Sequence, residues 1–145
     1  MNFKKVLIAI DESTFSAHAA DVGMDLARSL GAEAAFVTVV DPAQAQSAAD
    51  SGVPASQWMA EAQREAQALL AAFRDRAAAQ PPALVFLQSG GPAAKIVEAA
   101  ANWPADVIVI GTHGRGAVGS ILLGSVAQSV LRHAPCPVMI VRAPK

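Results

Sequence analysis

Five short apolar runs alternate with helical patterns along the whole chain, and this alternation limits the folds open to it. The runs are rich in β-branched and small apolar residues and end at loop-forming residues, which is typical of buried strands. Strands and helices in strict alternation predict right-handed crossovers and an open, mostly parallel sheet with helices on both faces. Ligands of such sheets bind beyond the carboxyl ends of the strands, where the strand order reverses. The predicted strands span residues 3–10, 34–40, 83–88, 106–110 and 137–142.

Helical periodicity marks the segments between these strands. Ser13 or Ser16 could cap the first helix, and Gly31 ends it. The polar stretch 43–56, rich in Ala, Gln and Ser, is expected to be the least ordered part, an excursion within one domain rather than a boundary. The predicted helices span 13–30, 58–77 and 92–100, and a last one begins at 125.

Length and composition predict a single domain covering residues 1–145. Apolar residues make up 53% of the chain and aromatic residues only 5%, so Ala, Val, Leu and Ile must supply most of the core. No stretch approaches the ~20 apolar residues needed to cross a bilayer, and no cleavable apolar segment opens the chain. We therefore expect a cytoplasmic protein without a membrane partner. Cys136, the only cysteine, is expected to be buried and inert.

Charge is unevenly distributed along the sequence. The net charge of -1 gives no general reason to expect nucleic acid as a partner. No Asp or Glu follows Asp106, whereas Arg115, Arg132, Arg142 and Lys145 do. The last part of the chain therefore favours an anionic ligand.

The segment from Gly111 to Gly124 holds five glycines between a predicted strand and a predicted helix. Glycines there allow positive φ and close approach to a ligand, so that successive N–H groups can point at phosphate oxygens. The helix that begins at Ser125 adds its positive N-terminal end. This pattern predicts a phosphate cradle, and the alternative is that the glycines only permit tight turns.

Two better-known phosphate signatures match this segment incompletely. Residues 119–125 have the glycine spacing of a P-loop, but no lysine follows Gly124. Residues 114–119 satisfy G-x-G-x-x-G, but they do not follow the first strand and no acidic residue lies downstream to hold a ribose. A Walker-type phosphoryl-transfer site and a dinucleotide dehydrogenase are both disfavoured.

Gly111, Gly114, Gly124 and Ser125 follow the spacing Gly-x-x-Gly, nine residues, Gly-Ser. On this spacing the chain resembles the ATP-binding type of the universal stress protein family, as a single-domain member. The resemblance implies an α/β three-layer sandwich whose five-stranded parallel sheet has the order 3-2-1-4-5, of the adenine nucleotide alpha hydrolase-like, Rossmann-like kind. The likeness runs from residues 6–13 to residues 131–142.

The resemblance also implies a set of binding residues. Adenine would lie between the ends of the first two strands, and Asp11 would face the ribose or a phosphate-bound Mg²⁺. The alternative for Asp11 is to cap the first helix, and His113 could donate to a phosphate or be a solvated loop residue. Ala127 stands where many ATP-binding members carry a second hydroxyl. The implied set is Ala9, Asp11, Val39, Ile110, Gly111, His113, Gly114, Gly124, Ser125 and Val126.

These features favour a protein that binds ATP and acts as a switch in stress response or signalling. The sequence shows no evident general base or activated nucleophile. One alternative is a slow Mg²⁺-dependent ATPase. Another is a nucleotide-free dimeric interaction module. In either case Val138 to Val141 would form a sheet-edge strand, and the resemblance implies a homodimer paired through it.

Overall fold

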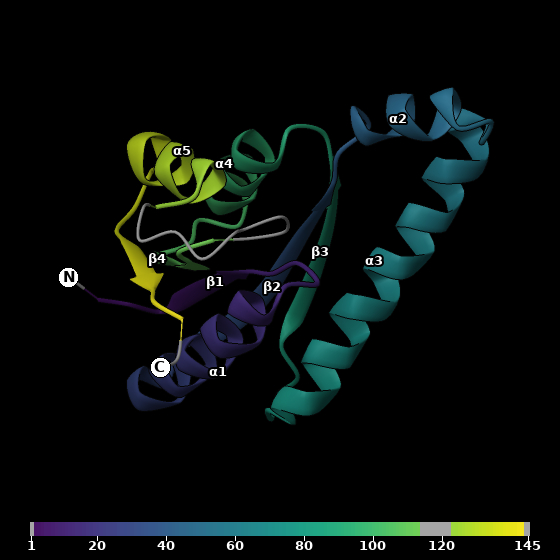
Figure 1. Ribbon diagram of the computed structural model, residues 1–145. Helices are drawn as coiled ribbons and strands as arrows, with labels where there is room; N and C mark the ends of the chain where they lie inside the picture. Colours follow the sequence, from purple (N-terminus) through teal and green to yellow (C-terminus); the bar gives the residue numbers. More distant parts are fainter. Residues whose placement is uncertain (1, 114–122, 144–145) are drawn as a thin grey trace.

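The computed structural model describes residues 2–113 and 123–143. Its strands form one parallel sheet in the order β3-β2-β1-β4-β5, which confirms the predicted fold class and strand order (Figure 1). The elements in chain order are β1 Lys5–Ala9, α1 Thr14–Leu30, β2 Glu33–Val40, α2 Gln44–Asp50, α3 Ala55–Ala77, β3 Leu84–Ser89, α4 Pro92–Asn102, β4 Val107–Gly111, α5 Ser125–His133 and β5 Val138–Val141.

Helices cover both faces of the sheet. Helices α1 and α3 pack on one face, and α4 and α5 pack on the other (Figure 1). Because side chains alternate along a strand, β1 supplies both cores: Val6 and Ile8 face α1 and α3, whereas Leu7 and Ala9 face α4 and α5. No helix in the described part of the chain is both long and apolar enough to cross a membrane.

Helix α1 approaches the sheet closely at Gly23. A Cβ built there would lie 2.7 Å from the Cδ1 and Cγ1 atoms of Ile8, which is fully buried. The absence of a side chain at Gly23 lets α1 pack closely against β1.

The stretch expected to be least ordered contains a helix, so that prediction is wrong. Helix α2 occupies Gln44–Asp50 and buries Ala45. It lies at one end of α3, beyond the edge of the sheet (Figure 1). Its polar composition reflects a helix with little buried surface rather than a lack of structure.

The reversal of strand order lies between β1 and β4. The chain moves outward from β1 through β2 to β3, returns by α4 to β4, and continues to β5. The carboxyl ends of β1 and β4 therefore meet at a point that no crossover covers, and Asp11 and Gly111 leave the sheet there.

Candidate functional site

A cleft of about 670 Å³ opens at the carboxyl edge of the sheet. It is formed by the ends of β1, β2 and β4, the first turn of α5 and one side of α3. All of the binding residues implied by the sequence that the structure describes line this one cleft; Gly114 lies outside the described residues. They are Ala9, Asp11, Val39, Ile110, Gly111, His113, Gly124, Ser125 and Val126.

Gly111 and Gly124 lie at closely packed positions. A Cβ on Gly111 would lie 3.2 Å from the Cβ of Phe15, and one on Gly124 would lie 3.0 Å from the carbonyl oxygen of Thr112. Gly124 has an extended conformation with φ -63° and ψ 156°, and neither glycine has a positive φ. The expectation of left-handed backbone is therefore wrong for these two positions, where the missing side chain is what matters.

The backbone amides of this region divide into two groups. The Thr112 amide donates to the Val141 carbonyl at 3.0 Å, and the Gly124 amide donates to the Thr112 carbonyl at 2.7 Å. These two amides bond within the protein, so the expectation that successive amides of the loop face a ligand fails for them. The amides of residues 125–127 lie in the first turn of α5, where a helix supplies no acceptor of its own. The anion-attracting part of the cleft is thus the helix N-terminus.

His113 is held in a fixed position at the edge of the cleft. Its Nδ1 atom lies 3.1 Å from Thr112 Oγ1, and its ring contacts that of Phe15 with centroids 5.4 Å apart. Its Nε2 atom is buried and has no hydrogen-bond partner within residues 2–113 and 123–143. His113 is half-buried, and a ligand oxygen would satisfy a nitrogen that is costly to leave unpaired.

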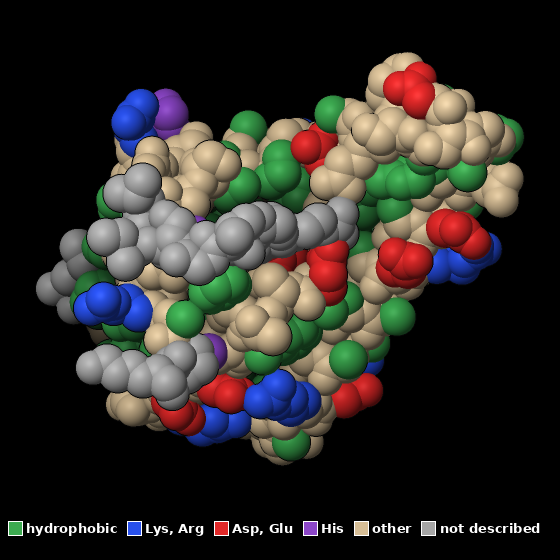
Figure 2. All heavy atoms as spheres, viewed as in Figure 1, with side chains coloured by type: hydrophobic (Ala, Val, Ile, Leu, Met, Phe, Trp, Pro, Cys, Tyr) green, Lys and Arg blue, Asp and Glu red, His purple; other side chains and the backbone are tan. Residues whose placement is uncertain are grey.

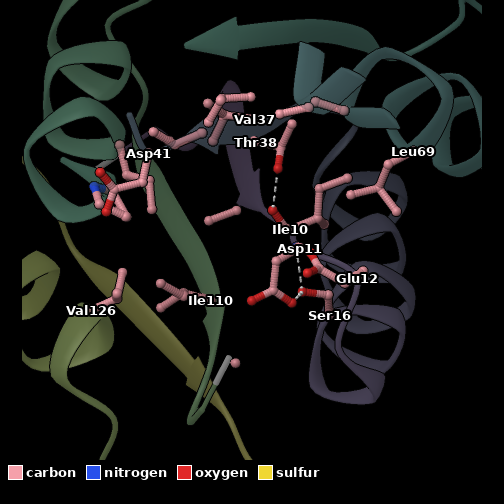
Figure 3. Close-up of a pocket in the computed structure, with 18 of the residues that line it drawn as sticks. Ile10, Asp11, Glu12, Ser16, Val37, Thr38, Asp41, Leu69, Ile110 and Val126 are labelled. Carbon is pink, nitrogen blue, oxygen red and sulfur yellow. Dashed lines mark hydrogen bonds between the residues drawn. The ribbon is translucent and has the colours of Figure 1, made fainter. Parts of the chain in front are cut away.

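Asp11 shapes the start of α1 and also faces the cleft (Figure 3). Its Oδ1 atom accepts hydrogen bonds from the Ser13 amide and the Ser16 hydroxyl, both at 2.8 Å. The N-cap residue of α1 is Ser13, whose side chain makes no capping bond. Asp11 therefore supports the helix start from outside it, a role compatible with facing a ligand.

The described residues hold no cluster of three or more His, Cys, Asp or Glu side chains arranged to bind a metal ion. A divalent cation at Asp11 would need further oxygen ligands from the bound molecule itself. Nucleotide phosphates are the usual source of such ligands for Mg²⁺.

Sequence reasoning missed the wall of the cleft that α3 provides. Trp58, Glu61, Ala62, Glu65 and Leu69 all line the cleft, and Leu69 lies across it from Val126 (Figure 3). The sequence predicted a helix over 58–77, and only the second half of its apolar side packs against the core. A helix of 23 residues is about 35 Å long, which is longer than the six-residue strand β3. The length of the helix was therefore the available signal that part of it extends past the sheet.

Thr38 on β2 was also missed. It is 6% exposed, and its hydroxyl donates to the Ile10 carbonyl at 2.8 Å (Figure 3). This bond ties the end of β1 to β2 inside the cleft. A buried hydroxyl with a backbone partner is satisfied, so Thr38 fixes the cleft floor.

Comparison with known proteins agrees with this architecture. The model of the universal stress protein family matches residues 2–142. A universal stress protein encoded in the QAH/OAS sulfhydrylase 3′ region of Thermus aquaticus is 38% identical over 97% of this chain and 99% of its own length. Among solved structures, the universal stress protein UspA of Lactobacillus plantarum superposes with a TM-score of 0.83 at 22% identity, covering 98% of this chain and 99% of that one.

A second solved structure is a universal stress protein in complex with cAMP. It is 25% identical, has a TM-score of 0.70, and covers 99% of this chain and 100% of that one. The family match over nearly all residues and the Thermus relative lead to one conclusion. This chain belongs to the universal stress protein family.

Proposed function

We propose that the cleft binds an adenine nucleotide, with ATP as the ligand, and that occupancy acts as a switch in stress response or signalling. The observation that carries this proposal is the convergence of four separate elements on one cleft. The ends of β1, β2 and β4 and the first turn of α5 supply the binding residues that the family resemblance implies. The cAMP complex of a relative with the same fold supports an adenine nucleotide as the ligand class.

The phosphates would lie against the N-terminus of α5. The first-turn amides and the helix dipole attract negative charge there, and the Ser125 hydroxyl and His113 Nε2 stand on the same cleft. The base would lie toward Ala9 and Val39, at the ends of β1 and β2.

Mg²⁺ fits this arrangement as a companion of the phosphates. The Asp11 carboxylate would supply one oxygen ligand, and the cation would neutralise part of the triphosphate charge. Asp11 is held in place by Ser13 and Ser16, so it needs little rearrangement to meet a cation.

A homodimer through β5 belongs to the same proposal. This strand pairs with β4 on one side only, and Val138, Met139 and Ile140 are partly exposed. A second copy pairing along the open side would cover both the hydrogen-bonding groups and the apolar side chains.

Isothermal titration calorimetry with ATP, ADP and AMP tests nucleotide binding. The sharpest variant is Ser125→Asp, because a carboxylate at the first position of α5 suits the helix dipole but repels phosphate. We expect it to weaken ATP binding by at least about tenfold, which corresponds to roughly 1.4 kcal/mol. Ser125→Asn, similar in size and uncharged, should remain within about threefold of the wild type.

Two results would overturn the proposal. One is that the wild-type protein binds none of the three nucleotides at millimolar concentration. The other is that Ser125→Asp binds ATP as tightly as Ser125→Asn does. Chromatography of the titrated samples would show whether ADP accumulates, which separates binding alone from slow hydrolysis.

A further inference from the structure

The two ends of the cleft differ in charge. One end is the N-terminus of α5, which attracts anions. The other carries carboxylates: Glu61 and Glu65 on α3 and Asp41 after β2 all line the cleft. Acidic side chains lie along α3 on the face drawn in Figure 2. Asp11 and Glu12 also line the cleft, so the helix N-terminus, rather than a separation of acidic side chains, would draw the phosphates toward α5 and leave the uncharged part of the ligand toward α3.

Trp58 stands on the α3 side of the cleft and contributes to neither hydrophobic core. It is half-buried and lines the cleft, yet it is absent from both clusters of packed side chains. The other tryptophan, Trp103, packs edge-on against Phe86 at 5.7 Å between ring centroids. Further along α3, Leu70 and Phe73 do belong to the core. A half-buried aromatic side chain that lines the cleft outside both cores can contact a ligand there.

The helical spacing places further apolar residues on the same wall. Ala62 lies four residues after Trp58, and Leu69 lies seven residues after Ala62, so all three share one face of α3. All three line the cleft, which Val39 also lines from the end of β2. An apolar surface with an indole ring opposite a strand end suits a planar, uncharged group.

We propose that Trp58 contacts the base of the bound nucleotide by aromatic stacking and makes the cleft selective for nucleotides over base-free sugar phosphates. This inference rests on the proposed function and adds to it a specificity residue on α3. The positive N-terminus of α5 holds the phosphates, and the indole ring then contacts the uncharged base at the other end of the ligand. Base-aromatic stacking is sequence-tolerant, so selectivity follows from the presence of a planar base rather than from its hydrogen-bonding edge.

Calorimetry with two probes tests the assignment. AMP carries the base, and ribose 5-phosphate keeps the phosphate and sugar without it. Trp58→Ala should weaken AMP binding about tenfold and leave ribose 5-phosphate binding unchanged. Trp58→Phe should keep most of the AMP affinity because it retains a ring. Met59→Ala is the matched control, since Met59 is a half-buried neighbour on α3 that does not line the cleft.

Fluorescence gives a second reading that does not depend on truncating Trp58. The chain has two tryptophans, so Trp103→Phe leaves Trp58 as the only indole. AMP should change the emission of this variant, and ribose 5-phosphate should not. The inference is overturned if wild type and Trp58→Ala bind AMP equally tightly, or if both probes change the emission equally. Failure of the wild type to bind AMP, ADP or ATP would instead refute the proposed function, and this inference with it.

Discussion

Asp11 is joined to the Ser16 side chain by two hydrogen bonds, one through its backbone amide and one through its carboxylate. The Asp11 amide donates to Ser16 Oγ at 2.7 Å, and the Ser16 hydroxyl donates to Asp11 Oδ1 at 2.8 Å. Ser16 is 6% exposed and sits in the first turns of α1. A residue at the end of a strand is thus locked to the helix that follows, which fixes where its carboxylate points.

This lock allows the charge of Asp11 to be tested without disturbing its neighbours. Asp11→Asn keeps an oxygen acceptor for Ser13 and Ser16 but removes the negative charge. If Asp11 holds Mg²⁺ with the phosphates, the variant should lose most of the dependence of ATP affinity on Mg²⁺ while retaining AMP binding. Titrations with and without Mg²⁺ measure this. An unchanged Mg²⁺ dependence would remove Asp11 from the proposed cation site.

Ser16→Ala should destabilise the fold. The substitution leaves the Asp11 amide without its acceptor in a partly buried position, at a cost of about 2 kcal/mol in the free energy of unfolding. Ser29→Ala is the control, because Ser29 is an exposed residue of α1 whose hydroxyl donates only to the Asp25 carbonyl. Its effect should stay within about 0.5 kcal/mol. Urea denaturation measures both free energies of unfolding. Equal losses in the two variants would show that the Asp11–Ser16 pair stabilises the fold no more than an exposed hydrogen bond does.

Gly23→Ala should also destabilise the protein, although alanine is the better helix former by about 1 kcal/mol. The added methyl would lie 2.7 Å from Ile8, a fully buried residue of β1 that packs against α1. Overpacking of this kind costs about 1–3 kcal/mol. Removing a methyl from the partner, in the double variant Gly23→Ala with Ile8→Val, should recover part of the loss. A stabilised single variant, measured by urea unfolding, would contradict the close approach.

Most of the fold followed from local patterns. The apolar run at 107–110 lies in β4, which is buried throughout, and Gly31 ends α1 in the left-handed conformation expected of a helix cap. Strand order came from the family resemblance, since periodicity cannot say which strands are neighbours. Helix α2 was missed because its packing is slight, and only tertiary contact with α3 distinguishes it from a polar loop.

The site was predictable where backbone position decides it. Strand ends and a helix N-terminus are marked by Asp11, Gly111 and Ser125, and these do meet at one cleft. The α3 wall could not be predicted in the same way, because an apolar stripe looks alike whether it covers a sheet or a ligand. The left-handed backbone expected at Gly124 was also wrong, since close contact with the Thr112 carbonyl explains that glycine instead.

Cys136 provides a prediction about alkaline stability. Burial raises the pKa of its thiol above the ordinary 9.0, and the charge of Asp106 raises it further. A raised pKa in the folded state means that the folded protein holds this proton more tightly than the unfolded chain does. The resulting stability is fully present below about pH 9 and is lost as the pH rises through the higher folded value.

Two measurements check this expectation. The free energy of unfolding in urea should fall above about pH 9 more steeply in the wild type than in Cys136→Ala. Iodoacetamide should alkylate the native thiol more slowly at pH 8 than it alkylates the unfolded chain, because less thiolate is present. The sequence has no tyrosine, so no phenol titrates in the same range. A native thiol as reactive as the unfolded one would contradict the raised pKa.

The exposed edge of β5 allows the proposed homodimer to be tested against a matched site on the same sheet. Met139, 36% exposed, lies on β5, whereas Leu84, 45% exposed, lies on β3 at the opposite edge. Lysine on an edge strand opposes pairing with another strand, because the charge would be buried in the new sheet. Met139→Lys should therefore convert the dimer to a monomer in light scattering, and Leu84→Lys should leave it intact. A monomeric wild type, or dissociation caused by Leu84→Lys rather than Met139→Lys, would exclude pairing through β5.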